Sequence, residues 1–108
     1  MIDWDRVQQL RDEIGADEFA EVVALFLDEA DDVLARITPD GGPVRLRDDC
    51  HFLKGAALNL GFKSLAALCQ SAERRARDGD CGIDLKELRN CYQDSRQNLL
   101  AGMADLAA

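Results

Sequence analysis

The sequence contains little of what interrupts a helix or favours a strand. Its 108 residues include only two prolines, Pro39 and Pro43. Val, Ile and Thr together number 10, whereas Leu and Ala number 15 each. Leu and Ala are strong helix formers, while the β-branched residues are those that favour strands. The composition therefore argues against a β-sheet protein and, at this length, predicts one all-α domain over residues 1–108.

Long apolar runs, a secretion signal and an excess of positive charge are also missing. No run approaches the roughly 18 apolar residues of a membrane-spanning helix. The first residues, MIDWDR, are acidic where a signal peptide would be basic and then apolar. The 13 Lys and Arg residues oppose 21 Asp and Glu residues, and the net charge of −8 repels phosphate backbones and anionic lipids. We therefore expect a cytoplasmic protein without a nucleic-acid or membrane partner.

The few cysteines and the single histidine do not match a metal or catalytic motif. Cys50, Cys69, Cys81 and Cys91 include no C-x-x-C pair of the kind that begins many zinc sites. Cys50 adjoins His51, but neighbours on a helix point about 100° apart and suit one metal ion poorly. There is no second histidine, and no base accompanies a Ser or Cys nucleophile. We expect no metal and no cofactor of the protein's own, with the cysteines acting as small apolar residues.

Apolar residues recur at helical spacing on both sides of the segment 38–43, which holds both prolines. The pattern predicts helices over residues 3–13, 17–38, 43–60, 64–78 and 84–106. Gly61 supplies a stop for the helix 43–60. Short connections between four long helices favour an antiparallel up-down four-helix bundle, with the short first helix packed across one end. Because the helices can bury their apolar faces against one another, we expect a monomer.

The helix 43–60 has an unusual outward face. At about 100° per residue, Leu53 and Ala57 point inward and His51 points outward. The outward face also carries Arg47, Lys54, Gly55, Leu58 and Phe62. A helix-interior Gly costs roughly 0.5–1 kcal/mol against Ala, so close helix packing or an approaching partner must require it, and its place beside His51 favours the partner. Leu58 and Phe62 form either a partner-binding patch or ordinary surface apolar residues, and Arg47 either contacts a partner or is solvated.

The segment HFLKG at residues 51–55, followed by Gly61, resembles the H-x-x-K-G…G signature of histidine-containing phosphotransfer (HPt) domains. These domains are four-helix modules that carry a phosphoryl group on histidine in multistep two-component relays. The acidic amphipathic helix before the motif and the Leu-rich helix after it extend the resemblance over most of the chain. Cys50 stands where Ala usually precedes the histidine, and its small size fits the same space.

The resemblance implies a role for three side chains. His51 would be the phosphoacceptor, and Lys54, one turn along, would offset the charge of the phosphoryl group. Glu73, 22 residues after the histidine, would orient the imidazole. The alternatives are an ordinary solvated lysine at position 54 and, for Glu73, an exposed ion pair with Arg77 at i+4.

The resemblance also implies the partners. Response-regulator receiver domains and a hybrid histidine kinase would exchange the phosphoryl group with the protein, and the receiver would supply Mg²⁺. A receiver would dock around His51 on Arg47, Gly55, Leu58 and Phe62. The protein would then be a stoichiometric phosphocarrier without catalytic turnover of its own. The alternative is a non-phosphorylated four-helix adaptor that docks a receiver or a kinase through the same patch.

Overall fold

The computed structural model describes residues 2–107, with side chains described for residues 2–105. It contains the helices α1 (Trp4–Ile14), α2 (Ala16–Arg36), α3 (Pro43–Leu60), α4 (Lys63–Arg77) and α5 (Leu85–Ala107), and a short 3-10 turn over Pro39–Gly41. Within these residues the only pairing of the β type is a single bridge between Ile2 and Phe62. The all-α prediction is confirmed, and each helix begins and ends within two residues of the predicted positions.

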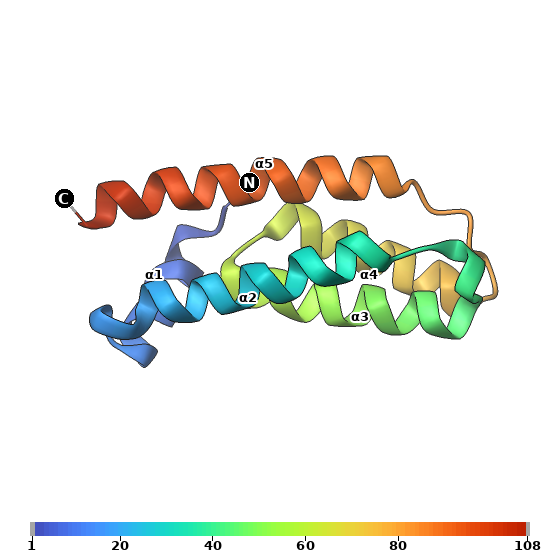
Figure 1. Cartoon of the computed structure of the whole chain (residues 1–108), viewed down its shortest axis with the longest axis horizontal. Helices are drawn as coiled ribbons and strands as arrows, with labels where there is room; N and C mark the ends of the chain where they lie inside the picture. Colours follow the sequence, from blue (N-terminus) through green and yellow to red (C-terminus); the bar gives the residue numbers. More distant parts are fainter. Residues whose placement is uncertain (1, 108) are drawn as a thin grey trace.

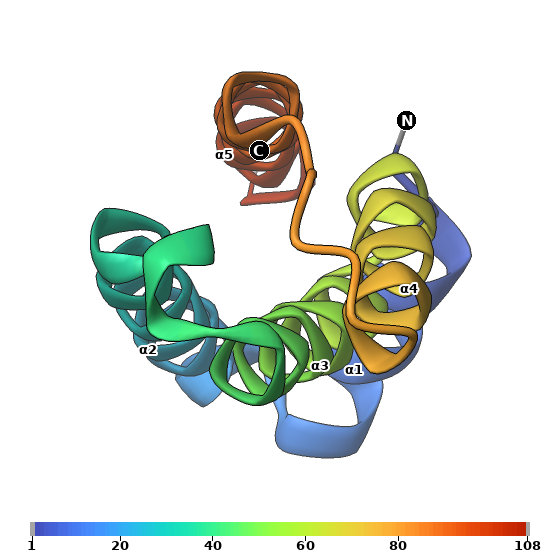
Figure 2. The ribbon, with the colours of Figure 1, turned by 90° about the vertical axis from the view of Figure 1, so that its right-hand side faces the viewer.

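The four long helices form an elongated antiparallel bundle of about 46 × 21 × 20 Å. In Figure 1 they lie side by side, and each runs opposite to the one before it. The end view in Figure 2 shows α5 across the bundle from α3, with α2 and α4 on either side. The short helix α1 packs against one end of α2 and α3. The predicted up-down four-helix bundle with an extra N-terminal helix is therefore confirmed.

Helix ends are set by local residues of the kinds expected from the sequence. The Asp3 carboxylate accepts a hydrogen bond from the Arg6 backbone N–H at 3.2 Å and caps α1. Gly61 ends α3 in the left-handed conformation, with φ of 73°. Its carbonyl accepts a hydrogen bond from the Asp3 N–H at 2.7 Å, and a Cβ at this glycine would lie 2.6 Å from the Asp3 carbonyl oxygen. Gly61 thus joins the start of α1 to the turn between α3 and α4.

The core holds a buried tyrosine that links α5 to α2. Tyr92 is 1% exposed, and its hydroxyl lies 2.5 Å from a carboxylate oxygen of Asp31 and 3.1 Å from the Leu27 carbonyl. Burial raises the pKa of Tyr92, so the phenol keeps its proton as a donor. The Arg89 guanidinium, also on α5, donates to the Leu34 carbonyl at the end of α2. These polar contacts fix where α5 lies along α2.

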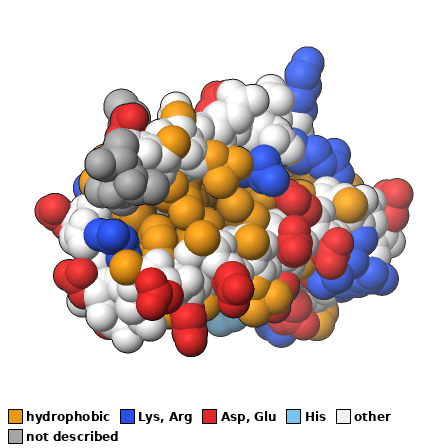
Figure 3. Space-filling view, turned by 60° about the vertical axis from the view of Figure 1, so that its left-hand side comes forward, with side chains coloured by type: hydrophobic (Ala, Val, Ile, Leu, Met, Phe, Trp, Pro, Cys, Tyr) orange, Lys and Arg blue, Asp and Glu red, His pale blue; other side chains and the backbone are white. Residues whose placement is uncertain are grey.

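The surface separates apolar and acidic regions. Figure 3 shows hydrophobic side chains gathered in the middle of one face, with Asp and Glu side chains along its lower edge and the histidine only at the lower margin. Leu25 on α2 and Leu100 on α5 are among the exposed large apolar residues. As far as the structure describes the chain, none of its helices combines the length and apolar character needed to cross a membrane.

Candidate functional site

His51 lies in the middle of α3 and points into solvent. Its side chain is 68% exposed. One turn along, Gly55 is also exposed, and a Cβ added there would meet no atom within 4 Å. Close packing inside the molecule therefore does not require this glycine. The missing side chain instead leaves open space beside the imidazole, where another molecule can approach.

The imidazole is held from α4 by Glu73. The Nδ1 atom of His51 lies 2.9 Å from Oε1 of Glu73, whose side chain is only 7% exposed. The two helices share the most extensive interface in the bundle, and both bury small residues there, including Cys50 on α3 and Cys69 on α4. Small residues let helix backbones approach closely, which brings the carboxylate to the edge of α3. The predicted geometry, with the Glu73 carboxylate facing the His51 helix, is what the structure has.

Two cations share the same carboxylate. The Lys54 ammonium lies 2.8 Å from Oε2 of Glu73, and the Arg77 guanidinium lies 3.4 Å from Oε1. The hydrogen bond from Lys54, and then that from His51, hold the pKa of the Glu73 carboxyl below its ordinary value, although burial opposes the shift. An ionised carboxylate only accepts hydrogen bonds, so Nδ1 of His51 carries the ring proton. The lone pair of Nε2 is left facing solvent.

The predicted ion pair between Glu73 and Arg77 is present, but the alternative of an exposed Glu73 is wrong, because its side chain is buried. The carboxylate contacts His51 across the helix interface and Arg77 along its own helix. Lys54, whose side chain is 25% exposed, is not a freely solvated lysine, because its ammonium is paired with Glu73. The sequence pattern did not show that Lys54 and Arg77 meet at one carboxylate.

A shallow groove between α2 and α3 runs beside the imidazole. Its walls are formed by Phe26 and Glu29 from α2 and by His51, Phe52, Gly55, Ala56 and Asn59 from α3. Phe52 is 43% exposed. The Asn59 amide donates to the Gly55 carbonyl at 3.1 Å and accepts from Arg6 at 3.1 Å, which links α1 to this wall. Phe52 was missed because at about 100° from His51 it belongs to neither the inward nor the outward face.

The prediction that Phe62 lies on the outward face is wrong. Phe62 is 1% exposed and packs edge-to-face against Tyr92, with ring centroids 6.4 Å apart. The helical projection fails because the left-handed Gly61 ends α3 one residue earlier and turns the chain inward. Leu58 is 57% exposed, as the helical position predicts. The Arg47 guanidinium lies 3.4 Å from the carboxylate of its neighbour Asp48.

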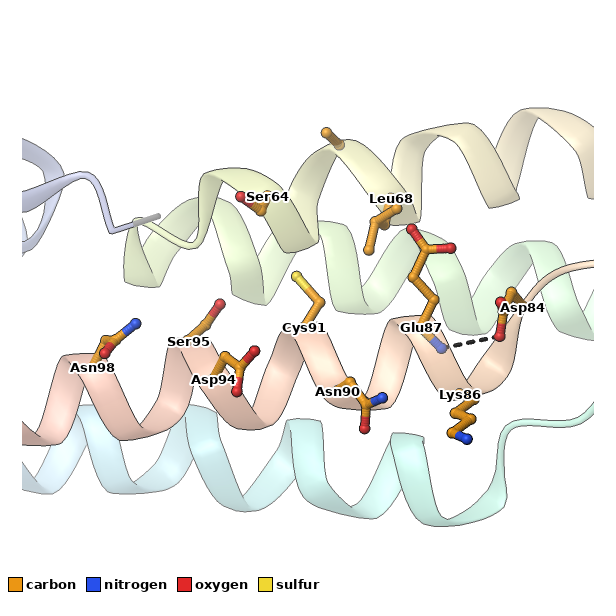
Figure 4. A pocket seen from close by; sticks show the side chains of 11 residues that line it. Ser64, Leu68, Asp84, Lys86, Glu87, Asn90, Cys91, Asp94, Ser95 and Asn98 are labelled. Carbon is orange, nitrogen blue, oxygen red and sulfur yellow. Dashed lines mark hydrogen bonds between the residues drawn. The ribbon is translucent and has the colours of Figure 1, made fainter.

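A second concave area lies between α4 and α5 (Figure 4). Leu68 from α4 and Cys91 from α5 lie on its inner side, and Asp84, Glu87 and Asp94 add carboxylates. None of the three groups around Glu73 lines this groove. It is therefore separate from the imidazole site.

The two buried thiols, those of Cys50 and Cys69, are poor metal ligands and poor nucleophiles. Burial raises the pKa of Cys50 to about 11 and that of Cys69 to about 12, so both remain protonated at neutral pH. Among the described residues, no group of three or more His, Cys, Asp or Glu side chains is arranged to hold a metal ion. The chemistry available at this site is therefore that of the imidazole and its ion-paired carboxylate.

Fold and site together define a class of protein. The helical bundle presents one imidazole to solvent, with its ring proton on Nδ1 and a lysine ammonium close by. The comparisons with known proteins agree: residues 21–98 match the model of the Hpt domain family. The chain belongs to this family and is a histidine phosphotransfer protein of a phosphorelay, a phosphotransfer intermediate.

Individual phosphorelay proteins are also similar to this chain in sequence. The phosphorelay protein LuxU of Vibrio vulnificus strain YJ016 is 30% identical over 83 residues, which cover 74% of this chain and 72% of LuxU. LuxU of strain CMCP6 gives the same values. Histidine-containing phosphotransfer protein 2 of Oryza sativa subsp. japonica is 34% identical over 103 residues, 86% of this chain and 68% of the plant protein. No solved structure matches the chain at comparable significance.

Proposed function

We propose that His51 is the phosphoacceptor, which takes a phosphoryl group from an aspartyl phosphate on one receiver domain and passes it to another. Hpt proteins relay phosphoryl groups between kinases and receiver domains. The observation that supports His51 is its hydrogen bond to Glu73, which places the ring proton on Nδ1 and leaves the Nε2 lone pair in solvent. A neutral imidazole with a free lone pair is the reactive form.

The transfer needs no proton to move at His51. The Nε2 lone pair attacks phosphorus, an N–P bond forms, and the P–O bond to the receiver's aspartate breaks, so that the aspartyl carboxylate leaves with the bonding electrons. The ring keeps its proton on Nδ1 and acquires positive charge, which the Glu73 carboxylate at 2.9 Å stabilises. The reverse sequence transfers the group to an aspartate of the second receiver.

Lys54 is proposed to offset the charge of the phosphoryl group. Its ammonium lies one helical turn from His51 and is already at the site, 2.8 Å from Oε2 of Glu73. A flexible lysine stem lets the ammonium turn from the carboxylate toward a group on Nε2. The receiver would contribute Mg²⁺ and most of the transition-state stabilisation, so this chain mainly positions a nucleophile.

The proposed docking face surrounds the imidazole. It consists of Arg47, Gly55 and Leu58, with Phe52 replacing the buried Phe62. Exposed apolar side chains beside an open glycine suit a partner whose own acidic pocket receives the imidazole. We also propose a hybrid histidine kinase upstream and a cytoplasmic location. A monomeric state is proposed because the buried apolar residues of the four helices pack against one another within one chain.

Transfer of radiolabel from a phosphorylated receiver tests the proposal. The wild type should become labelled, His51→Gln should not, and Gln97→Ala on the exposed face of α5 should behave as the wild type. Label on the His51→Gln variant would contradict the assignment. A wild type that binds the receiver but never takes label would favour the alternative, a docking adaptor that is not phosphorylated.

A further inference from the structure

Glu73 has one more cationic partner than the proposed chemistry uses. Besides Lys54, the Arg77 guanidinium reaches the carboxylate, and it contacts Oε1, the same oxygen that accepts the proton of His51. The Arg77 side chain is 60% exposed, whereas that of Glu73 is 7% exposed. Arg77 therefore reaches from the surface onto a buried carboxylate, four residues along the same helix.

A carboxylate beside a nucleophilic imidazole has two opposing effects. It fixes the proton on Nδ1, but its negative charge also favours a second proton on the ring, at Nε2. The doubly protonated ring has no lone pair with which to attack phosphorus. Before the N–P bond forms, the hydrogen bond from His51 to Glu73 is therefore useful only while nearby cations balance the carboxylate.

Lys54 alone cannot supply this balance throughout the transfer. A phosphoryl group that approaches Nε2 lies on the opposite side of the ring from Nδ1, where Glu73 sits. When the Lys54 ammonium turns toward the phosphoryl group, its contact of 2.8 Å with Oε2 weakens. The contact of Arg77 with Oε1 does not depend on the position of Lys54, because the two cations use different oxygens.

We propose that Arg77 is a positioning residue that balances the charge of Glu73 before the N–P bond forms, both in the free protein and when Lys54 turns to an incoming phosphoryl group. The carboxylate then keeps its hold on Nδ1 without drawing a second proton onto the ring. This inference rests on the proposed function and assigns different roles to the two cations. Lys54 faces the phosphoryl group, and Arg77 acts on the imidazole only through Glu73.

The other charged groups near the imidazole do not provide the same balance. From α2, Glu29 lines the groove beside His51 and adds negative charge. Asp49 of α3 is paired with Arg36 of α2 at 3.7 Å, and Arg47 is paired with Asp48. The thiols of Cys50 and Cys69 are buried and protonated. Arg77 is thus the cation on Glu73 that remains when Lys54 leaves.

The experiment compares Arg77→Gln, Glu73→Gln and the double variant. The protonated fraction of the His51 imidazole at neutral pH is read from its ¹⁵N chemical shifts in the free protein. Transfer is read as the single-turnover rate from a phosphorylated receiver. Arg74→Gln is the matched control, because it removes an exposed arginine from the same helix that is not among the cations paired with Glu73.

We expect Arg77→Gln to raise the protonated fraction of His51 and to slow transfer by roughly 1.5-fold to fivefold, the range of one partly exposed charge pair. Arg77→Lys should keep the protonated fraction of His51 and the transfer rate close to their wild-type values. Arg74→Gln should change neither quantity. In the Glu73→Gln background, Arg77→Gln should have no further effect. A neutral amide still accepts from Nδ1 and carries no charge that needs balance.

Two results would overturn the inference. One is an unchanged protonated fraction in Arg77→Gln. The other is an equal loss of transfer rate in the wild-type and Glu73→Gln backgrounds, which would mean that Arg77 contacts the receiver directly. A wild type that takes no phosphoryl group would overturn the proposed function instead, while the imidazole measurement on the free protein would still decide the role of Arg77.

Discussion

At the scale of single residues, the site depends on the environment of Glu73. A carboxylate with a 7% exposed side chain is costly unless it is paired and hydrogen-bonded. Here its two oxygens receive donors from His51, Lys54 and Arg77. The burial that makes Glu73 rigid also makes its hydrogen bonds strong, so the orientation of the imidazole is fixed before any partner arrives.

The depressed pKa of Glu73 predicts how stability depends on pH. A carboxyl whose folded pKa lies below its unfolded value of 4.5 contributes stability above that value and loses it as the pH falls through the folded pKa. We therefore expect the difference in unfolding free energy between the wild type and Glu73→Gln to shrink below pH 4.5. Urea denaturation at a series of pH values measures it. A difference that stays constant from neutral to acidic pH would contradict the pairing.

We expect the substitution Gly55→Ala to have opposite effects on the stability of the protein and on phosphoryl transfer. Because a Cβ there meets no atom within 4 Å, Gly55→Ala should stabilise α3 by about 0.5–1 kcal/mol through helix propensity alone. If the space beside His51 admits the receiver, the same variant should slow phosphoryl transfer. Denaturation and transfer rates measured on one preparation test both effects. Increased stability with unchanged transfer would remove Gly55 from the docking face.

At the scale of helices, the packing of the bundle includes close contacts between helices that the sequence pattern does not show. Trp4 at the start of α1 lies across Gly102 of α5, where a Cβ would overlap the indole ring. Trp4, Gly102 and Asp105 line a shallow pocket at this crossing. α1 therefore ties the first part of the chain to the last, at the end of the bundle away from the turn between α4 and α5 (Figure 1).

Gly102→Ala tests the contact between Trp4 and Gly102, with Gly55→Ala as its matched control. Both place alanine in a helix interior, where propensity alone predicts a gain. At Gly102 we expect a net loss of about 1–2 kcal/mol, because the indole ring or α5 must move. Denaturant midpoints of the two variants give the comparison. A gain at Gly102 equal to that at Gly55 would show that Trp4 does not press on this position.

Periodicity predicted the helices well because each long helix buries one apolar stripe. It did not predict Phe62, since the turn at Gly61 breaks the helical projection between positions 60 and 62. The contact of Tyr92 with Asp31 spans 61 residues, and no local pattern encodes it. The contact of Glu73 with His51 was expected from the family resemblance, but its pairing with Lys54 depends on the packing of α3 on α4.

At the scale of the whole molecule, burial divides the four cysteines into two classes. Cys50 and Cys69 are fully buried between α3 and α4, whereas Cys81 and Cys91 are half-buried. We expect a thiol reagent to label Cys81 and Cys91 in the folded protein, and Cys50 and Cys69 only after unfolding. Peptide mass spectrometry with and without urea measures the order. Labelling of Cys50 in the native state would show that the interface behind His51 opens.

The net charge of −8 also has a spatial pattern that bears on the partner. Acidic side chains border the apolar face in Figure 3, whereas the surroundings of His51 include Arg47, Lys54 and Arg77. An acidic protein repels an acidic partner less at a surface where Lys and Arg side chains gather. This distribution suits a receiver whose phosphorylated pocket is acidic.

We propose above that Glu73 leaves Nε2 of His51 as the atom that takes the phosphoryl group. The most direct measurement is the ³¹P and ¹⁵N NMR spectrum of the protein after it has been phosphorylated by a receiver. We expect a single phosphoryl group bonded to Nε2, with Nδ1 still protonated and hydrogen-bonded to Glu73. A phosphoryl group on Nδ1 or on any other residue would contradict it.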